Sequence, residues 1–199
     1  MPVYIFLATA VTALAVENPV FARALGLGRD TMFMKTPMSG ILLGAALTWM
    51  TTVSSLFVAL INFALAGALN AAVTRPLLYL ASVALVYAIT TIDLLPRRIK
   101  SPYYRQKLQE VFPVATFNTA LFGAFYISVT QNFEAFQTVG YALGTGAGYT
   151  AAILLIYFAR KRLALSPVPR SFRGLPVLLV YLGLVSLALY GLTGRVLPT

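Results

Sequence analysis

Long apolar runs separated by short polar segments dominate the pattern of this chain. Six runs, each near or above the length that spans a bilayer, cover about 3–25, 38–66, 76–95, 108–129, 136–158 and 175–192. A helix needs about 20 mostly apolar residues to cross the hydrocarbon core. The alternation of apolar and polar residues that is typical of a membrane barrel does not recur. The sequence therefore predicts an all-α polytopic membrane protein with six transmembrane helices in one integral membrane domain, residues 1–199.

Composition supports this class. The chain is 59% hydrophobic and 10% charged, with a mean hydropathy of +0.83, whereas a typical soluble domain is about 45–50% apolar and about 25% charged. The apolar run at the start also contains Ala13-Leu14-Ala15, the spacing of a signal-peptide cleavage site. No Lys or Arg precedes it, so we expect this run to be retained as a helix.

Charge placement predicts the orientation. Of the 15 Lys and Arg residues, 13 lie in three loops, at about 23–35, 96–107 and 159–174, and the other two are Arg75 and Arg195. By the positive-inside rule these three loops face the cytoplasm, so both termini are expected on the outer face of the cytoplasmic membrane. Basic loops attract anionic lipid headgroups. Membrane lipid therefore explains the net charge of +10, and no nucleic-acid partner is expected.

A weak internal repeat suggests two halves. Shifting the chain by 100 residues aligns Asn18 with Asn118 and Gly44 with Gly144, and gives 16 identities in 99 positions, where composition alone gives roughly 9. An odd number of spans per half makes the second half upside down relative to the first. We expect two inverted three-helix repeats, at about 1–96 and 104–199.

The first and fourth spans are expected to be broken. Asn18-Pro19 interrupts the first, and Pro113 with Asn118 interrupts the fourth. Asn followed by Pro is a favourable start for a helix, so a fresh half-helix is predicted from Pro19. Broken helices at membrane depth often line a site for ions, which makes Asn18 and Asn118 ion-path candidates. The alternative is an ordinary proline kink stabilised by neighbouring hydroxyl groups.

Glu17 is the one carboxylate well inside a span, and an ionisable group in lipid is a functional candidate by default. Its structural alternative is a local ion pair with Arg23 or a cap at the helix break. Asp93 stands four residues before Arg97, a spacing that predicts an ion pair on one helix face.

Glycines at four-residue spacing indicate close helix packing. They form one series on the fifth span and a shorter one on the second: Gly140, Gly144 and Gly148, and Gly40 and Gly44. The chain has no Cys and no His, which excludes thiolate chemistry, His-based acid–base catalysis and His or Cys metal ligation. No catalytic residue and no cofactor bound by the chain's own side chains are predicted.

Several stretches resemble the RnfA/NqrE family of membrane subunits. They are Asn18–Phe21 and Ala24–Gly28 in the first half, Phe117–Gly123 in the second, the loop Val168–Gly174 with its Phe-Arg-Gly sequence, and Ser186–Gly194. The resemblance covers essentially the whole chain. It implies a six-helix subunit with inverted halves and a sister subunit of opposite topology, RnfE/NqrD-like. The pair would sit in a complex that couples electron transfer to Na⁺ or H⁺ translocation.

One departure from the family is important. The resemblance implies one Cys in each half, four in the subunit pair, holding an intramembrane iron–sulfur centre. The matching positions here are Gly28 and Thr119, which cannot ligate iron. We therefore expect a structural and ion-path subunit rather than an electron carrier. The alternatives are the substrate-binding membrane component of an energy-coupling-factor vitamin transporter, which has a similar size and helix number, and a stand-alone carrier.

Overall fold

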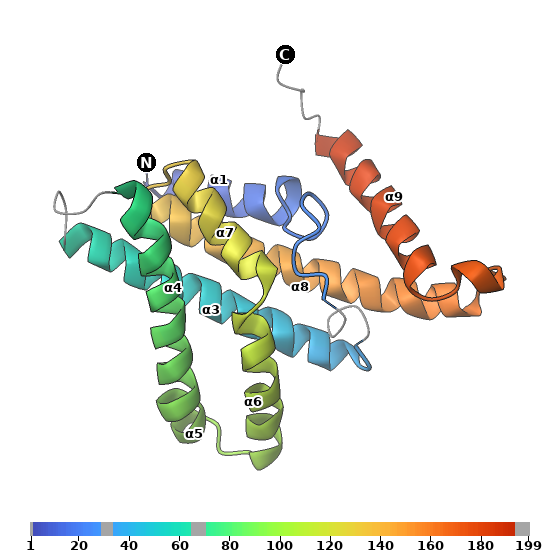
Figure 1. Ribbon diagram of the computed structural model, residues 1–199, viewed down its shortest axis with the longest axis horizontal. Helices are drawn as coiled ribbons and strands as arrows, with labels where there is room; N and C mark the ends of the chain where they lie inside the picture. The colour runs from blue at the N-terminus through green and yellow to red at the C-terminus, as the bar shows by residue number, and fades with distance from the viewer. Residues whose placement is uncertain (1, 29–33, 65–70, 194–199) are drawn as a thin grey trace.

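The computed structural model describes residues 2–28, 34–64 and 71–193, and their regular structure is entirely helical (Figure 1). The helices are α1 (Pro2–Val11), α3 (Pro37–Ala64), α4 (Ala71–Ile89), α5 (Leu95–Arg98), α6 (Pro102–Thr116), α7 (Thr119–Thr130), α8 (Ala135–Leu165) and α9 (Leu175–Thr193). Two π-helical turns, η1 (Thr12–Val16) and η2 (Thr90–Leu94), extend α1 and α4, and a short 3-10 turn, η3 (Arg170–Phe172), precedes α9.

Helices α3 and α8 form the centre and run antiparallel. A Cβ atom at Gly44 would overlap Thr150, and one at Gly146 would overlap Thr48. Further along α3, the Thr51 hydroxyl donates to the carbonyl of Ala142 at 3.3 Å. Residue numbers along α8 therefore decrease as those along α3 increase, as expected for antiparallel helices. Small residues at these crossings let the two backbones approach closely.

Helix α1 lies parallel to α8 along a second row of glycines. A Cβ atom at Gly140 would meet the carbonyl of Phe6, and one at Gly144 would overlap that of Ala10. A Cβ atom at Gly148 would lie 2.8 Å from Asn18 Nδ2 and 3.0 Å from the Leu14 carbonyl oxygen. The contacts advance by four residues on both helices, so α1 follows α8 in the same direction.

The remaining helices cover this centre unequally. The Tyr79 ring on α4 stacks on Phe125 of α7 with centroids 4.4 Å apart. Helix α9 inserts Leu178 and Leu182 into the core but leaves Leu184 and Leu187 exposed. Figure 1 shows α9 leaning away from the other helices.

Some of the described helices are long enough to span a membrane. Three helical stretches are long and apolar enough to cross a bilayer, Pro37–Ile61, Pro76–Arg98 and Ala135–Leu165, and a fourth results if α6 and α7, bent by 43°, count as one broken span. The apolar stretches Val3–Val16 and Leu175–Gly191 are shorter. The prediction of an all-helical, multi-pass membrane protein is confirmed, whereas the number six stays a prediction.

The two expected breaks have different outcomes. The fourth span is broken at Phe117–Asn118, as predicted. The predicted half-helix from Pro19 is wrong, because residues 19–23 form only a turn. The backbone then adopts positive φ at Ala24 (52°) and Gly26 (78°). These left-handed conformations end any helix that Asn18 could start.

Candidate functional site

The candidate site is the place where the two breaks meet α8. At the first break, Asn18 Oδ1 accepts hydrogen bonds from the backbone N–H groups of Val20 (3.0 Å) and Phe21 (3.3 Å). Its Nδ2 group donates to the carbonyls of Leu14 and Gly148, both at 3.0 Å. One amide side chain therefore closes the end of the first helix, caps the following turn and fixes both to α8.

The second break repeats the capping bond. Asn118 Oδ1 accepts from the N–H of Ala120 at 2.9 Å, as an N-cap of α7. Its Nδ2 group donates to the Tyr149 hydroxyl of α8 at 2.8 Å. The two asparagines thus reach neighbouring residues of α8, near the middle of that 31-residue helix.

Direct bonds also join the two breaks. The Tyr149 hydroxyl donates to the carbonyl of Gly26 at 3.3 Å, and the N–H of Gly26 donates to Thr119 Oγ1 at 2.7 Å. A Cβ atom at Gly26 would overlap the Tyr149 ring and lie 2.9 Å from Asn118 Oδ1. Glycine is therefore required at position 26 both by the positive φ and by the lack of space.

Burial explains why these contacts are needed. Asn18, Asn118 and Tyr149 are 4%, 6% and 0% exposed. An unpaired amide or carbonyl in an apolar environment costs several kcal/mol, roughly 2–7 depending on the reference state. Each break frees backbone groups that a continuous helix would pair internally, and in lipid no water replaces the lost partner. The asparagines supply those partners.

Glu17 lies immediately before the first capping residue, at the end of η1. Its carboxylate accepts a hydrogen bond from the Tyr141 hydroxyl at 3.1 Å and pairs with Arg23 at 3.6 Å. The Glu17 side chain is 12% exposed and that of Arg23 is 37% exposed. The ion pair with Arg23, the structural alternative expected from the sequence, is present, so the carboxylate is anchored at the break. The other expected ion pair, Asp93 with Arg97, is also present at 2.9 Å.

A cavity of about 340 Å³ opens beside the first break. It lies between residues 15–22 and one face of α9, and its lining includes Asn18, Phe21 and Tyr190. The break is therefore bordered by space as well as by packed side chains.

The positions that match the family's cysteines do not fit an iron–sulfur centre. Gly28 has no side chain and is exposed. The Thr119 hydroxyl already accepts the hydrogen bond from Gly26. Iron–sulfur clusters are held by Cys thiolates, with His in some centres, and the chain has neither residue. Within the described residues no three Asp or Glu side chains gather in a metal-binding group either.

Two tyrosines of this site were missed from the sequence. Tyr141 and Tyr149 each follow a glycine of the α8 series, so a Gly-Tyr pair occurs twice, eight residues apart. That spacing places both rings on one side of a helix, and a buried tyrosine hydroxyl usually finds a polar partner. The repeated Gly-Tyr pair was therefore the available indication that polar partners from other segments contact α8 at these two tyrosines.

The two series of packing glycines contact different helices. Gly140, Gly144 and Gly148 face α1 and the first break, whereas Gly44 faces α8 from α3. Gly40 is less crowded, since a Cβ atom there would lie 3.3 Å from Ile153 Cγ2 and 3.4 Å from Met34 Sδ.

Together these features define a polytopic helical membrane protein in which two interrupted segments meet at the middle of a central helix. The chain belongs to the Rnf-Nqr family of membrane subunits, since the family model described as Rnf-Nqr subunit, membrane protein, matches residues 6–196.

Curated relatives agree with this assignment. The chain is similar to the A subunit of the ion-translocating oxidoreductase complex of Glaesserella parasuis, with 33% identity over 91% of this chain and 92% of the relative. The same subunit of Syntrophotalea carbinolica is 32% identical over 92% of this chain and 94% of the relative. That of Pectobacterium atrosepticum is 31% identical over 94% and 95%.

Proposed function

We propose that this chain is the A-type membrane subunit of an ion-translocating oxidoreductase complex, and that it serves the ion path and the assembly of the complex without a catalytic residue of its own. The family match and the relatives' names support the complex. The meeting of the two breaks at α8 supports the ion path, because interrupted helices present backbone groups at membrane depth.

In this proposal Glu17 handles the ion. A carboxylate oxygen suits a hard cation such as Na⁺ and also accepts a proton. Glu17 is anchored by Tyr141 and Arg23 directly before the break, and the cavity next to Asn18 gives the break room for water or an ion. Asn18 and Asn118 act as positioning residues, since the hydrogen-bonding atoms of both amides are already engaged within the chain.

The electron path of the complex does not use side chains of this subunit. Neither Gly28 nor Thr119 supplies a sulfur ligand. Redox centres therefore belong to other subunits, and this chain contributes ion passage and an interface for a sister membrane subunit of opposite topology.

The proposed topology has six spans in two inverted halves, with both termini outside. The antiparallel pairing of α3 with α8 supports it, because these helices are the second and fifth spans and inversion gives them opposite directions. Reporter fusions after Arg98 and after Arg162 should report a cytoplasmic location, and a fusion after residue 199 an external one. A cytoplasmic report at residue 199 would contradict both the six spans and the inverted halves.

Replacing Glu17 by Gln tests the ion-path role. The substitution keeps the shape and the Tyr141 contact but removes the charge. We expect ion-coupled electron transfer, measured in proteoliposomes of the purified complex, to fall about a hundredfold or more, since a positioned proton-transfer group typically contributes about 10²–10⁴-fold. Subunit stoichiometry should not change.

Glu110→Gln is the matched control, because Glu110 on α6 is an exposed carboxylate. It should retain wild-type coupling. Loss of assembly in Glu17→Gln would favour a purely structural ion pair with Arg23. Unchanged coupling would contradict the ion-path role.

A further inference from the structure

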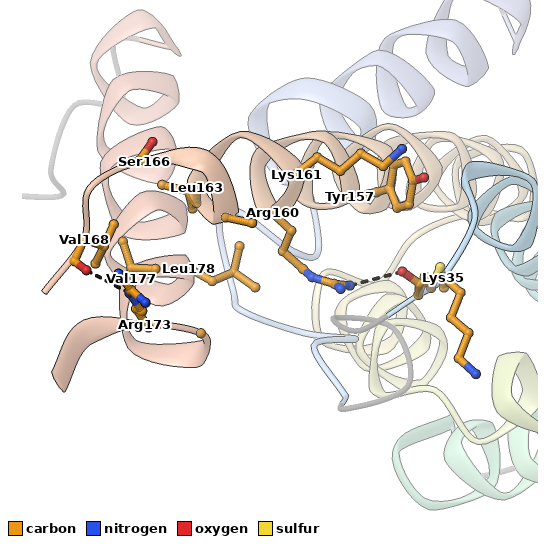
Figure 2. Close-up of a pocket in the computed structure, with 13 residues that line it drawn as sticks. Lys35, Tyr157, Arg160, Lys161, Leu163, Ser166, Val168, Arg173, Val177 and Leu178 are labelled. Carbon is orange, nitrogen blue, oxygen red and sulfur yellow. Dashed lines mark hydrogen bonds between the residues drawn. The ribbon is translucent and has the colours of Figure 1, made fainter. Parts of the chain in front are cut away.

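A second cavity, of about 680 Å³, lies at the end of α8 where the chain turns toward α9, and none of its lining residues belongs to the breaks (Figure 2). Its walls come from three separate segments: the residues before α3, the last turns of α8, and the loop and first turn that lead into α9. The last segment holds the Phe-Arg-Gly stretch at 172–174. Gly174 adopts a φ of +90° there and directs the chain into α9.

The polar lining is strongly cationic. Lys35, Arg160, Lys161 and Arg173 line the cavity, and no carboxylate is among its described lining residues. Arg160 donates to the carbonyl of Met34 at 3.1 Å, and Arg173 Nε donates to that of Val168 at 3.0 Å. Figure 2 shows Arg160 reaching from α8 toward the segment of Lys35, with Arg173 beside Val168 and Val177 at the other side.

Several of these positive charges are not neutralised. Within the described part of the chain, Lys35 forms no ion pair and the terminal nitrogens of Arg173 have no hydrogen-bond partner. Lys161 Nζ lies over the Tyr157 ring, 4.9 Å from its centroid, and forms no ion pair within the same described residues. Like charges around one cavity repel, and an anion in the cavity would remove that repulsion.

The other part of the lining is apolar, which distinguishes lipid from a small free anion. Met34, Leu163, Val177 and Leu178 line the same cavity. Leu175, Leu179 and Val180 continue this apolar surface along exposed faces of α9. A further, largely apolar cavity of about 480 Å³ shares Leu163 and extends to Tyr181. Cationic groups at the end of a span next to an exposed apolar helix suit a charged headgroup with its acyl chains.

We propose that this cavity binds one anionic phospholipid, with its phosphate among Arg160, Arg173 and the two lysines and its acyl chains along α9. The bound lipid fills the space between α8 and α9, whose described contacts rely on few core residues such as Leu178 and Leu182. This site is independent of the ion path, since none of its lining residues belongs to the breaks.

The test uses the full chain purified in mild detergent, delipidated, and titrated with phosphatidylglycerol or phosphatidylcholine under native mass spectrometry. The pocket variant K35Q/K161Q/R173Q keeps Arg160, because Arg160 also fixes Met34. The matched control K100Q/K107Q/R98Q removes the same number of charges from exposed or partly exposed positions at the end of α5, the start of α6 and the segment between them. Size-exclusion profiles of both variants should match the wild type.

We expect one phosphatidylglycerol molecule to remain bound to the wild type and to the control. The pocket variant should bind it roughly tenfold to a hundredfold more weakly, because each removed cation takes away part of the attraction to the anionic headgroup. Phosphatidylcholine should bind weakly to all three proteins. Inorganic phosphate should not displace the bound lipid.

Three results would overturn the proposal. Equal losses in both triple variants would mean unspecific surface attraction. Displacement of the lipid by inorganic phosphate would mean a site for free anions. Release of a soluble subunit from the intact complex by the pocket variant, with lipid binding unchanged, would mean a protein-docking surface.

Discussion

Asn18 and Asn118, one hundred residues apart in the chain, make the same capping hydrogen bond and are held by adjacent parts of α8. Each side-chain oxygen accepts from the backbone N–H two residues later, at 3.0 Å and 2.9 Å. Each side-chain nitrogen then reaches α8, at the Gly148 carbonyl and the Tyr149 hydroxyl. Both breaks are thus stabilised in the same way, by an asparagine that pairs the backbone groups freed where a helix is broken in lipid.

The number of bonds predicts unequal effects of removing the two amides. Asn18→Ala removes four hydrogen bonds of the side chain, and Asn118→Ala removes two. We expect losses in the free energy of unfolding of about 2–4 kcal/mol and about 1–2 kcal/mol, respectively. Unfolding followed by circular dichroism in mixed micelles would measure both. Gln131→Ala, at an exposed position, is the control, and an equal or reversed order would contradict this account of the breaks.

Tyr149→Phe should destabilise the contact between the breaks while keeping the packing of the ring. The lost hydroxyl leaves Asn118 Nδ2 and the Gly26 carbonyl without that partner in a buried place, a cost of about 1–3 kcal/mol. The same unfolding measurement applies, and Tyr126→Phe is the control, since Tyr126 is 68% exposed.

A double-mutant cycle sharpens this test. Tyr149→Phe and Asn118→Ala share one hydrogen bond, so their combined effect should be smaller than the sum of the single effects. If the two single effects simply add, the Tyr149 hydroxyl and the Asn118 amide do not stabilise the protein through their shared hydrogen bond.

The sequence was sufficient for the features that local chemistry decides. Apolar run length predicted the helices, and the positions of Pro113 and Asn118 predicted the broken fourth span. The same rules failed at Pro19. An Asn-Pro start favours a helix only if the following residues continue it, and here Ala24 and Gly26 adopt positive φ, with Gly26 packed against Tyr149 and Asn118.

The candidate site could be predicted only in part. Glu17 was identified as a carboxylate inside an apolar run, and Asn18 and Asn118 as the matching residues of two expected helix breaks. Their convergence on α8 depends on which helix lies between the two breaks, and a periodic pattern does not contain that information. Tyr141 and Tyr149 were overlooked because a tyrosine in an apolar helix resembles an interfacial anchor unless its partner is known.

The close packing of α1 on α8 predicts a strong dependence on Gly144. An added Cβ atom would overlap the backbone carbonyl of Ala10, and backbone cannot swing aside as a side chain can. Gly144→Ala should cost about 1–3 kcal/mol, the usual range for overpacking, or prevent folding. Gly183→Ala on α9 meets nothing within 4 Å and should be neutral or stabilising by up to about 1 kcal/mol, as in other helix interiors. Thermal unfolding of the two purified variants compares them, and similar midpoints would show that α1 can retreat from α8.

Iron binding is not expected at the two positions that match the family's cysteines. A cluster shared by two sister subunits needs sulfur ligands from both, and this chain offers a bare backbone at Gly28 and a hydroxyl at Thr119 that already accepts from Gly26. Carboxylates are the remaining anionic ligands, and they suit hard cations rather than iron–sulfur clusters. We therefore expect the purified chain to contain no stoichiometric iron and the intact complex to show no paramagnetic cluster at this contact.

Thr119→Ala separates the two roles of the position: it should leave the iron content of the complex unchanged while lowering the stability of this subunit by about 1 kcal/mol through the lost bond to Gly26. Iron analysis with low-temperature electron paramagnetic resonance would decide. Iron that is lost in Thr119→Ala would show that the hydroxyl takes part in holding a metal, and that partner thiolates rebuild the family's centre around it.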